Sequence, residues 1–294
     1  RTNGGLIKSH GLEVMLGGTI IQTKDWNWDM NINWGLNRTT CEKLDSEATR
    51  FTLNTLRIGS VVVDEGGKYG DIVGKAYKRD DKGNIIVDDN GLPMRESNKV
   101  VGNMMPNWTG SITNTLRWKD LTFSALIDVR EGGEFISLTD SYACQAGTSA
   151  RTLEGREGAT IVVPGVTADG KPNTKGVTAE NYWSSIAGPD GIAEEFVYSS
   201  TYVKMREMSL GYILPQKWFM HSPISYVKLS LVARDLFYIY KAAPVNPEGA
   251  FSRSDYAQAF ELASLPPTRS IGFSLNVKFY FRRSEERFSR NAET

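Results

Sequence analysis

The sequence has 294 residues, with 34 basic and 34 acidic side chains and therefore no formal net charge at neutral pH. A neutral chain lacks the electrostatic attraction by which many proteins bind nucleic acid, and we expect no nucleic-acid partner. No run of residues approaches the 18 or so consecutive apolar positions that indicate a transmembrane helix.

Two long stretches at the start of the chain alternate apolar and polar residues with a period of two, which predicts β-strands. His10 to Gln22 is the first, and Trp26 to Asn37 is the second. Only Thr23-Lys24-Asp25 separates them, so we predict a hairpin. The second stretch is about twice as long as a usual strand and matches the 9–11 or so residues that cross a bilayer at a tilt. A strand of a membrane barrel and a long strand of a soluble β-sandwich both fit this pattern.

The same alternation recurs along the rest of the chain. Further strands are predicted at Trp108 to Trp118, Leu121 to Val129, Thr201 to Leu214, Ser225 to Ile239 and Ser270 to Phe281. The alternation slips by one residue at Arg206-Glu207, which predicts a β-bulge. Asp235 falls on the apolar side of its strand, which a local bulge or a position near the rim would explain.

The connections between these strands alternate in length. Short or moderate turns separate some strands, whereas the long stretches Arg38 to Asn107, Glu131 to Ser199 and Tyr240 to Pro267 separate the others. Leu53 to Asp64 and Asp71 to Lys78 are predicted strands within the first of these stretches. Outer-membrane barrels have short periplasmic turns and long extracellular loops. The sequence therefore predicts an all-β fold, an antiparallel transmembrane β-barrel with at least seven strands and long extracellular loops.

An odd number of strands leaves an open edge, and an open sheet edge cannot lie in lipid. The chain also begins in mid-pattern at Arg1 with no initiator Met. We therefore expect the C-terminal portion of a longer protein, with the missing strands upstream of Arg1. Residues 1–281 are expected to form the barrel portion, and residues 282–294 a charged C-terminal tail.

Several motifs occur in an order that resembles the C-terminal barrel region of the SusC/RagA family of TonB-dependent outer-membrane transporters. They are Gly102-Asn103, Pro106-Asn107-Trp108-Thr109-Gly110, Tyr202 to Pro215, Ala233-Arg234-Asp235-Leu236-Phe237, Asn246-Pro247-Glu248 and Pro267-Thr268-Arg269-Ser270-Ile271-Gly272. The likeness runs from about Gly4 to Phe281. The chain departs from the family at its charged tail and at Asp235, where the family pattern has Asn.

The resemblance implies a barrel of about 22 strands with a plugged lumen. It also implies location in the bacterial outer membrane and import of oligosaccharides or peptides. The implied partners are the TonB complex, through an N-terminal part absent from this sequence, and a SusD-like surface lipoprotein acting as a lid.

Three sets of residues are candidates for distinct environments. Aromatic side chains in the second long stretch are candidates for ligand contact, with packing of the loop or contact with the lid as the alternatives: Tyr142, Tyr182, Trp183 and Tyr198. Charged side chains are expected to line the lumen, where they pair with each other or with the plug, or line the transport route: Arg117, Asp128, Arg130, Lys204, Arg206, Lys228 and Arg234. Large apolar side chains are expected to face outer-membrane lipid: Trp26, Trp28, Trp34, Phe123, Phe273 and Phe279.

Little in the sequence favours catalysis. No nucleophile elbow, phosphate-binding glycine loop or zinc spacing occurs, so we expect no enzyme activity, no cofactor and no metal. The two cysteines, Cys41 and Cys144, are expected to be unpaired, although a bridge between surface loops is an alternative. The alternative to a transporter is a soluble or surface-displayed β-rich carbohydrate-binding or adhesin module, in which the apolar strand faces would meet a dry protein core.

Overall fold

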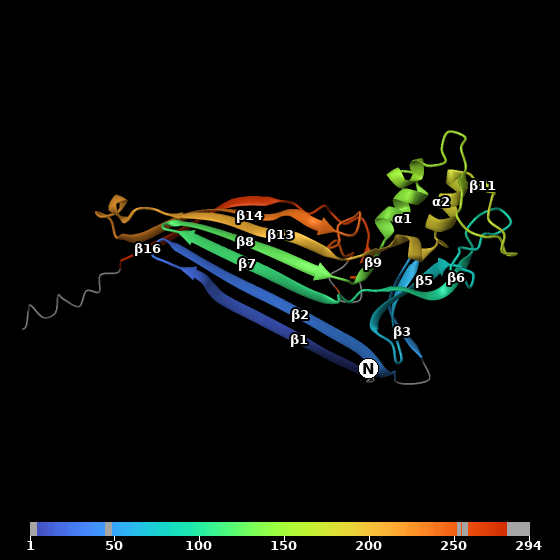
Figure 1. The fold of residues 1–294 in the computed structure, drawn as a ribbon, viewed down its shortest axis with the longest axis horizontal. Helices are drawn as coiled ribbons and strands as arrows, with labels where there is room; N and C mark the ends of the chain where they lie inside the picture. The colour runs from blue at the N-terminus through green and yellow to red at the C-terminus, as the bar shows by residue number, and fades with distance from the viewer. Residues whose placement is uncertain (1–4, 45–48, 252–253, 255–257, 281–294) are drawn as a thin grey trace, which may run out of the picture.

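The computed structural model describes residues 5–44, 49–251, 254 and 258–280 (Figure 1). Within them, one seven-stranded antiparallel sheet has the order β1-β2-β7-β8-β13-β14-β16. Its strands are β1 (Gly5–Gln22), β2 (Trp26–Leu44), β7 (Trp108–Trp118), β8 (Leu121–Glu131), β13 (Tyr202–Ile213), β14 (Ile224–Lys241) and β16 (Ser270–Phe279). All seven predicted strands are confirmed. The predicted tail at 282–294 and Phe281 lie outside the described residues.

The register gives the sheet one apolar and one polar face, because directly paired residues of antiparallel strands point to the same side. One row across the sheet pairs Trp28, Leu116, Phe123, Leu210, Leu231 and Phe273 in succession. The adjacent row pairs Asn27, Arg117, Thr122, Gly211, Ser230 and Ser274. Alternation along each strand is therefore kept in phase across the whole sheet.

The turns and the long loops lie at opposite ends of the sheet (Figure 1). Residues 23–25, 119–120 and 214–223 form the connections at one end. The first long loop (residues 45–107), the second (132–201) and the third (242–269) lie at the other end. The predicted alternation of connection lengths is confirmed.

The three long loops fold together into one unit, which we call the cap. The first loop forms a sheet of β3 (Arg50–Leu56), β4 (Gly59–Asp64), β5 (Tyr69–Tyr77) and β6 (Arg95–Asn103). The strand predicted at Leu53 to Asp64 is in fact two strands, because the chain turns at Arg57, where φ is +37°. The other loops join through β9 (Glu134–Ser137), which pairs with β12 (Val197–Ser199) and, in parallel, with β15 (Phe260–Glu261).

The second loop also contains two short helices that the sequence pattern did not predict. Helix α1 (Leu138–Gln145) begins after Ser137, whose hydroxyl accepts a hydrogen bond from the Asp140 N–H. Helix α2 (Ala179–Ala187) begins after Thr178, which caps the Asn181 N–H in the same way. Side-chain caps of this kind satisfy N–H groups that have no partner within the helix.

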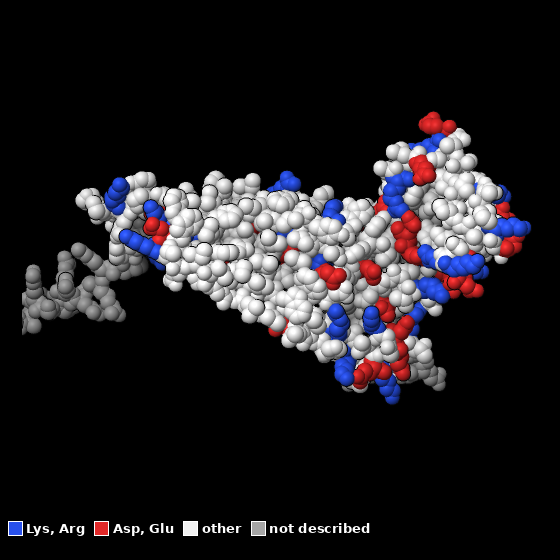
Figure 2. All heavy atoms as spheres, viewed as in Figure 1, with Lys and Arg blue, Asp and Glu red and all other residues white. Residues whose placement is uncertain are grey.

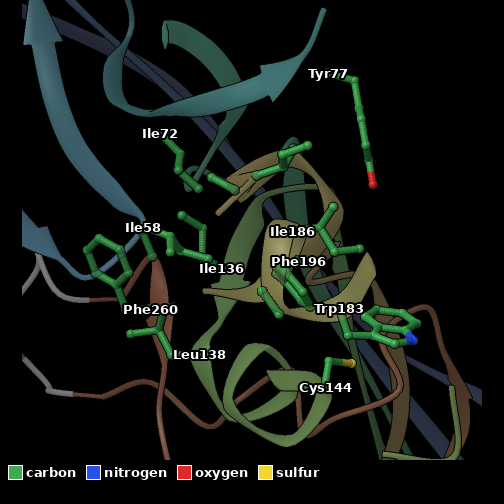
Figure 3. Packing of buried hydrophobic residues seen from close by; sticks show 14 of the residues in the cluster. Ile58, Ile72, Tyr77, Ile136, Leu138, Cys144, Trp183, Ile186, Phe196 and Phe260 are labelled. Carbon is green, nitrogen blue, oxygen red and sulfur yellow. The ribbon is translucent and has the colours of Figure 1, made fainter. Parts of the chain in front are cut away.

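All three loops contribute to the core of the cap (Figure 3). Ile72 and Tyr77 come from the first loop, Ile136, Leu138, Trp183, Ile186 and Phe196 from the second, and Phe260 from the third. The cap is therefore a packed unit at the loop end of the sheet. Between Gly5 and Tyr280, no described helix is long and apolar enough to cross a membrane.

Cys41 and Cys144 are both buried and unpaired, as predicted. They lie in separate apolar clusters, Cys41 beside Leu44 and Val63 and Cys144 in the core of the cap.

Candidate functional site

The apolar face of the sheet carries the side chains that were expected to face lipid. Trp26 pairs with Trp118, and their rings stack with centroids 5.9 Å apart. Trp34, eight residues along β2 on the same face, pairs with Gly110 on β7 and Val14 on β1. Phe273 is 80% exposed and Phe279 55% exposed. Figure 2 shows a broad band over the sheet with few charged side chains.

The polar face carries the charged side chains that were expected to line a lumen. Arg117 pairs with Asn27 and Thr122 near the short-turn end. Arg234 pairs with Glu207, and its Nε donates to the Glu207 carboxylate over 2.7 Å. The Lys228 side chain lies against Gly211, beside Ser230, on the same face. Whether these residues line a lumen stays a prediction.

Asp128, Lys204 and Arg206 come together near the loop end of the same face. Arg130 is not part of this group, and its Nη2 donates to the Met104 carbonyl over 3.0 Å. The bulge predicted at Arg206-Glu207 is confirmed, since the pairing of β13 with both neighbours skips Arg206. On β14 the pairing with β13 skips Asp235 and Leu236, and the φ of Asp235 is +52°. The local bulge explains why Asp235 breaks the alternation, because it brings that carboxylate to Lys204 and Arg206.

Lys204 lies at the centre of this group, which we call the charge cluster (Asp128, Lys204, Arg206, Asp235 and Glu248). Lys204 is 2% exposed, and its Nζ lies 2.7 Å from Asp235 Oδ1 and 2.6 Å from Glu248 Oε2. Arg206 forms ion pairs with Asp128, with Asp235 at 3.0 Å and with Glu248 at 2.5 Å. A buried cation needs such partners, because its desolvation costs several kcal/mol.

Glu248 belongs to the third loop and not to the sheet. Burial alone would raise the pKa of its carboxyl, but hydrogen bonds from Arg206, Lys204 and Tyr238 lower that pKa to about 2. A lowered folded-state pKa stabilises the docked loop at any pH above the ordinary value of about 4.3. That contribution is lost only as the pH falls towards 2.

The third loop therefore joins the charge cluster to the cap. One end of it is held by Glu248, and further along the chain Glu261 enters the cap core. Ser137 Oγ and Thr139 Oγ1 donate to the Glu261 carboxylate over 2.6 and 2.7 Å, and that residue is 4% exposed.

The aromatic candidates for ligand contact lie in different environments within the cap. Tyr142 is 45% exposed, and the Arg57 guanidinium lies 3.9 Å from the centroid of its ring. Trp183 is buried in the core, with Tyr182 packed edge-on against it at a centroid distance of 5.2 Å. For Tyr182 and Trp183 this placement favours the packing interpretation, and ligand contact by Tyr142 stays a prediction.

Tyr198 is part of a polar network. Its hydroxyl donates to Asp140 Oδ2 over 2.6 Å and accepts from Arg151 Nη1 over 3.0 Å. Burial and the Asp140 carboxylate raise the pKa of Tyr198, so its hydroxyl stays protonated and remains a donor. Its contacts also favour the packing interpretation.

Tyr202, Tyr238 and Glu248 also belong to this site, although no pattern in the sequence marks them as site residues. Tyr238 Oη donates to Glu248 Oε2 over 2.8 Å, and Tyr202 Oη donates to Asp128 Oδ2 over 3.2 Å. The available signals were the irregular position of Asp235 and the motif Asn246-Pro247-Glu248. No group of three or more His, Cys, Asp or Glu suited to a metal ion occurs within the described ranges.

Comparison with known proteins adds to this geometry. No family model matches the chain. The TonB-dependent receptor P3 of Formosa agariphila is 22% identical over 94% of this chain and 29% of that protein. The RagAB peptide importer in its "open-open" state gives a TM-score of 0.64 at 18% identity, over 94% of this chain and 29% of the other. Its "closed-closed" state gives a TM-score of 0.63 at 19% identity, over 93% of this chain and 29% of the other.

This chain has the fold of a TonB-dependent transporter barrel. The resemblance noted in the sequence is thereby confirmed at the level of fold. The chain spans 29% of the length of the receptor it matches. The proteins it resembles are a receptor and peptide importers by name.

Proposed function

We propose that this chain forms part of the wall of a plugged outer-membrane β-barrel that imports oligosaccharides or peptides with energy supplied through TonB. The observation that carries this proposal is the sheet itself. Its strands keep an apolar face in phase from β2 to β16, and Phe273 and Leu275 on that face are 80% and 65% exposed. Burying such side chains is favourable by about 25 cal/mol per Å², so the face needs an apolar environment, and outer-membrane lipid supplies it.

The polar face then faces the lumen. A wet interior favours the paired charges of the charge cluster, which a lipid face would exclude. The cap lies at the end with long loops, which is the extracellular end of such barrels. We propose that a SusD-like surface lipoprotein covers this end, and that the TonB complex acts on a plug that this chain does not contain.

The alternative function, a soluble or surface-displayed binding module, requires a protein layer over the apolar face. Among the described residues, the packed clusters lie in the cap and at its junction with β2, and none includes Phe273 or Phe123. The exposed face therefore favours the membrane barrel.

A pair of arginine substitutions on β16 tests the proposal. Phe273 pairs with Leu231 on the apolar face, whereas its neighbour Ser274 pairs with Ser230 on the polar face. In lipid, Phe273→Arg should cost about 2–4 kcal/mol near the middle of the bilayer. We expect the full-length protein with this change to be lost from outer membranes and to lose the fast-migrating folded band on unboiled gels.

The matched control, Ser274→Arg, places the same charge one residue away on the wet side and should assemble normally. If both variants assemble equally well in outer membranes, the lipid-facing assignment is wrong. If the wild-type protein stays soluble without detergent, the barrel proposal fails as a whole.

A further inference from the structure

The connection between β13 and β14 (residues 214–223) is the longest of the three at the short-turn end of the sheet. Figure 1 shows it at the end of the sheet farthest from the cap. It contains a short 3₁₀ turn, η3 (Gln216–Trp218), and exposes large apolar side chains. Trp218 is 63% exposed and Met220 is 70% exposed. Neighbouring exposed apolar side chains of this kind indicate a surface that another molecule covers.

An aromatic row on the apolar face indicates the depth of this connection in a membrane. Trp26, Trp118, Leu121 and Tyr212 pair in succession across β2, β7, β8 and β13. Trp and Tyr are enriched at the membrane–water interfaces of such barrels. Residues 214–223 begin two positions beyond Tyr212, which is about 7 Å along a strand. The connection therefore lies at the level of the lipid headgroups.

The aromatic row does not continue over the last two strands. On β14 and β16 its members are Leu229 and Leu275, which have no polar edge for the interface. Trp218 lies in the connection that leads into β14. It therefore supplies an amphipathic aromatic side chain at the end of the sheet where the row lacks one.

A cleft of about 750 Å³ lies along this connection. Its volume falls within the range of about 300–1,000 Å³ that is usual for small-molecule sites. Phe219, Met220, Pro223 and Ile224 supply its apolar lining. Ile224 pairs with Phe279, and directly paired residues share a face of the sheet. The cleft therefore continues the apolar face beyond the ends of the strands.

The polar side chains that line the cleft are hydrogen-bonded within the protein. Gln216 Nε2 donates to Tyr280 Oη over 3.2 Å. Ser222 Oγ donates to the Phe219 carbonyl over 2.9 Å and accepts from the Ile224 N–H over 3.2 Å. A ligand in the cleft is therefore not needed as their hydrogen-bond partner. Since the rest of the lining is apolar, a hydrocarbon chain fits it better than water does.

Lys217 adds a positive charge beside the cleft. It is exposed, it precedes Trp218, and residues 214–223 contain no Asp or Glu. In the part of the chain that the structure describes, Lys217 forms no ion pair. An exposed ammonium group at the level of the headgroups favours an anionic lipid, and a phosphate oxygen is a strong acceptor for it.

We propose that residues 214–223 bind a phospholipid of the periplasmic leaflet, with an acyl chain in the cleft and the phosphate at Lys217. The cleft alone would fit any hydrocarbon, and the ammonium group alone would fit any anion. Side by side at the edge of the apolar face, they match an amphiphile that carries its phosphate next to its hydrocarbon chains. The inference rests on the proposed outer-membrane barrel and goes beyond it by assigning a lipid-binding site to one connection.

The test is fluorine NMR of the full-length protein, labelled with 5-fluorotryptophan and purified in an uncharged detergent. Trp218→Phe identifies the Trp218 resonance by its absence. Trp183→Phe identifies a reference in the core of the cap, where Trp183 is 7% exposed. The probes are dioleoylphosphatidylglycerol, which is anionic, dioleoylphosphatidylcholine, which has no net charge, and glycerol 3-phosphate, which has no acyl chains.

We expect both phospholipids to shift the Trp218 resonance and to leave that of Trp183 unchanged. Phosphatidylglycerol should act at a concentration about three- to tenfold lower than phosphatidylcholine, because its net charge is opposite to that of Lys217. Glycerol 3-phosphate should have no effect at the same concentrations, because it places nothing in the cleft.

Lys217→Gln removes the charge and leaves the cleft unchanged. We expect it to weaken the binding of phosphatidylglycerol by about three- to tenfold, so that the preference over phosphatidylcholine disappears. Lys82→Gln is the matched control. Lys82 is also exposed but lies in the cap, so this variant should bind both lipids as the wild type does.

Met220→Ser removes an apolar side chain from the cleft without altering a buried core. We expect it to weaken the binding of both phospholipids by about three- to tenfold, because less hydrocarbon is removed from water. Met15→Ser makes the same change on β1, where Met15 is 81% exposed and pairs with Asn33 on the polar face. It should leave lipid binding unchanged.

The proposal is overturned if neither phospholipid shifts the Trp218 resonance, or if glycerol 3-phosphate shifts it as strongly as phosphatidylglycerol does. An unchanged affinity for phosphatidylglycerol in Lys217→Gln or in Met220→Ser also contradicts the assigned site. Heat-modifiable migration of the same sample separates this inference from the proposed function. A protein that assembles in outer membranes but shows no lipid response refutes only the lipid site, whereas failure to assemble refutes the import proposal.

Discussion

Glu248 joins the third loop to the sheet through hydrogen bonds from three side chains. Lys204, Arg206 and Tyr238 all donate to its carboxylate. Because Lys204 is almost completely buried, the carboxylate also compensates for the desolvation of that ammonium group. This one acidic residue thus fastens the first part of the third loop to the polar face.

Glu248→Ala should release the third loop locally. Losing one partner of a buried ion pair costs about 3–5 kcal/mol, and we expect about 2–3 kcal/mol here because the Glu248 side chain is 26% exposed. Hydrogen exchange of residues 242–251, followed by mass spectrometry, should then be roughly 30-fold faster or more.

Glu42→Ala is the control for this measurement. Glu42 pairs with Lys8 at 3.1 Å, but both side chains are largely exposed, so its loss should cost less than about 1 kcal/mol. Equal protection of residues 242–251 in wild type and Glu248→Ala would show that the charge cluster does not hold the loop.

At the scale of the elements, two bulges on neighbouring strands form the charge cluster. The extra residue at Arg206 lies on β13, and the irregularity at Asp235 lies on β14, so the two side chains meet across the strand pair. Asp235 adopts a φ of +52°, a conformation that Asn and Asp tolerate better than other side chains.

Asp235→Asn and Asp235→Val separate charge from backbone conformation. Both remove the anion beside Lys204, but a β-branched residue in the left-handed region adds about 1–2 kcal/mol of strain. We expect the valine variant to lose its folded gel band at a lower temperature than the asparagine variant does. Arg234→Val is the control. It places valine one position earlier on β14, where φ is not positive, and should therefore add no such strain.

If Asp235→Val and Asp235→Asn lose the folded gel band at the same temperature, the backbone conformation of the bulge contributes nothing to stability beyond the charge.

At the scale of the whole molecule, the cap packs around a core of its own, and each long loop that forms it connects two strands of the sheet. The sheet has an uncovered apolar face and depends on its surroundings, whereas the cap has its own core. Phe260 of the third loop is fully buried in that core, and β15 completes the small sheet around β9. A substitution that destabilises the core of the cap should therefore leave the barrel wall folded.

Phe260→Ala tests this separation. Truncating a fully buried phenylalanine costs about 3–5 kcal/mol, so we expect trypsin to cut the cap of the variant in detergent while its heat-modifiable band is retained. Phe251→Ala in the same loop is the control, since Phe251 is 48% exposed and should stay resistant. Loss of the folded band together with the cap would mean that the two units unfold as one.

Much of the sheet could be predicted from the sequence because strand alternation is local. Apolar residues at every second position mark each strand and its faces, and the slip at Arg206-Glu207 marks the bulge without knowledge of any neighbour. The lengths of the connections indicate which ends of the strands lie together, because successive connections of an up-and-down sheet lie at opposite ends, and short turns and long loops therefore alternate.

The cap and the charge cluster were decided by tertiary structure alone. Helices α1 and α2 have only 8 and 9 residues, too few to be stable without packing or to give a clear periodic signal. The sequence left ligand contact and loop packing open for Trp183, and residues from distant segments of the chain bury it. Glu248 meets Lys204 and Arg206 only because the third loop folds back onto the sheet. Contacts of this kind depend on burial and charge pairing between segments far apart in sequence, and no local pattern records them.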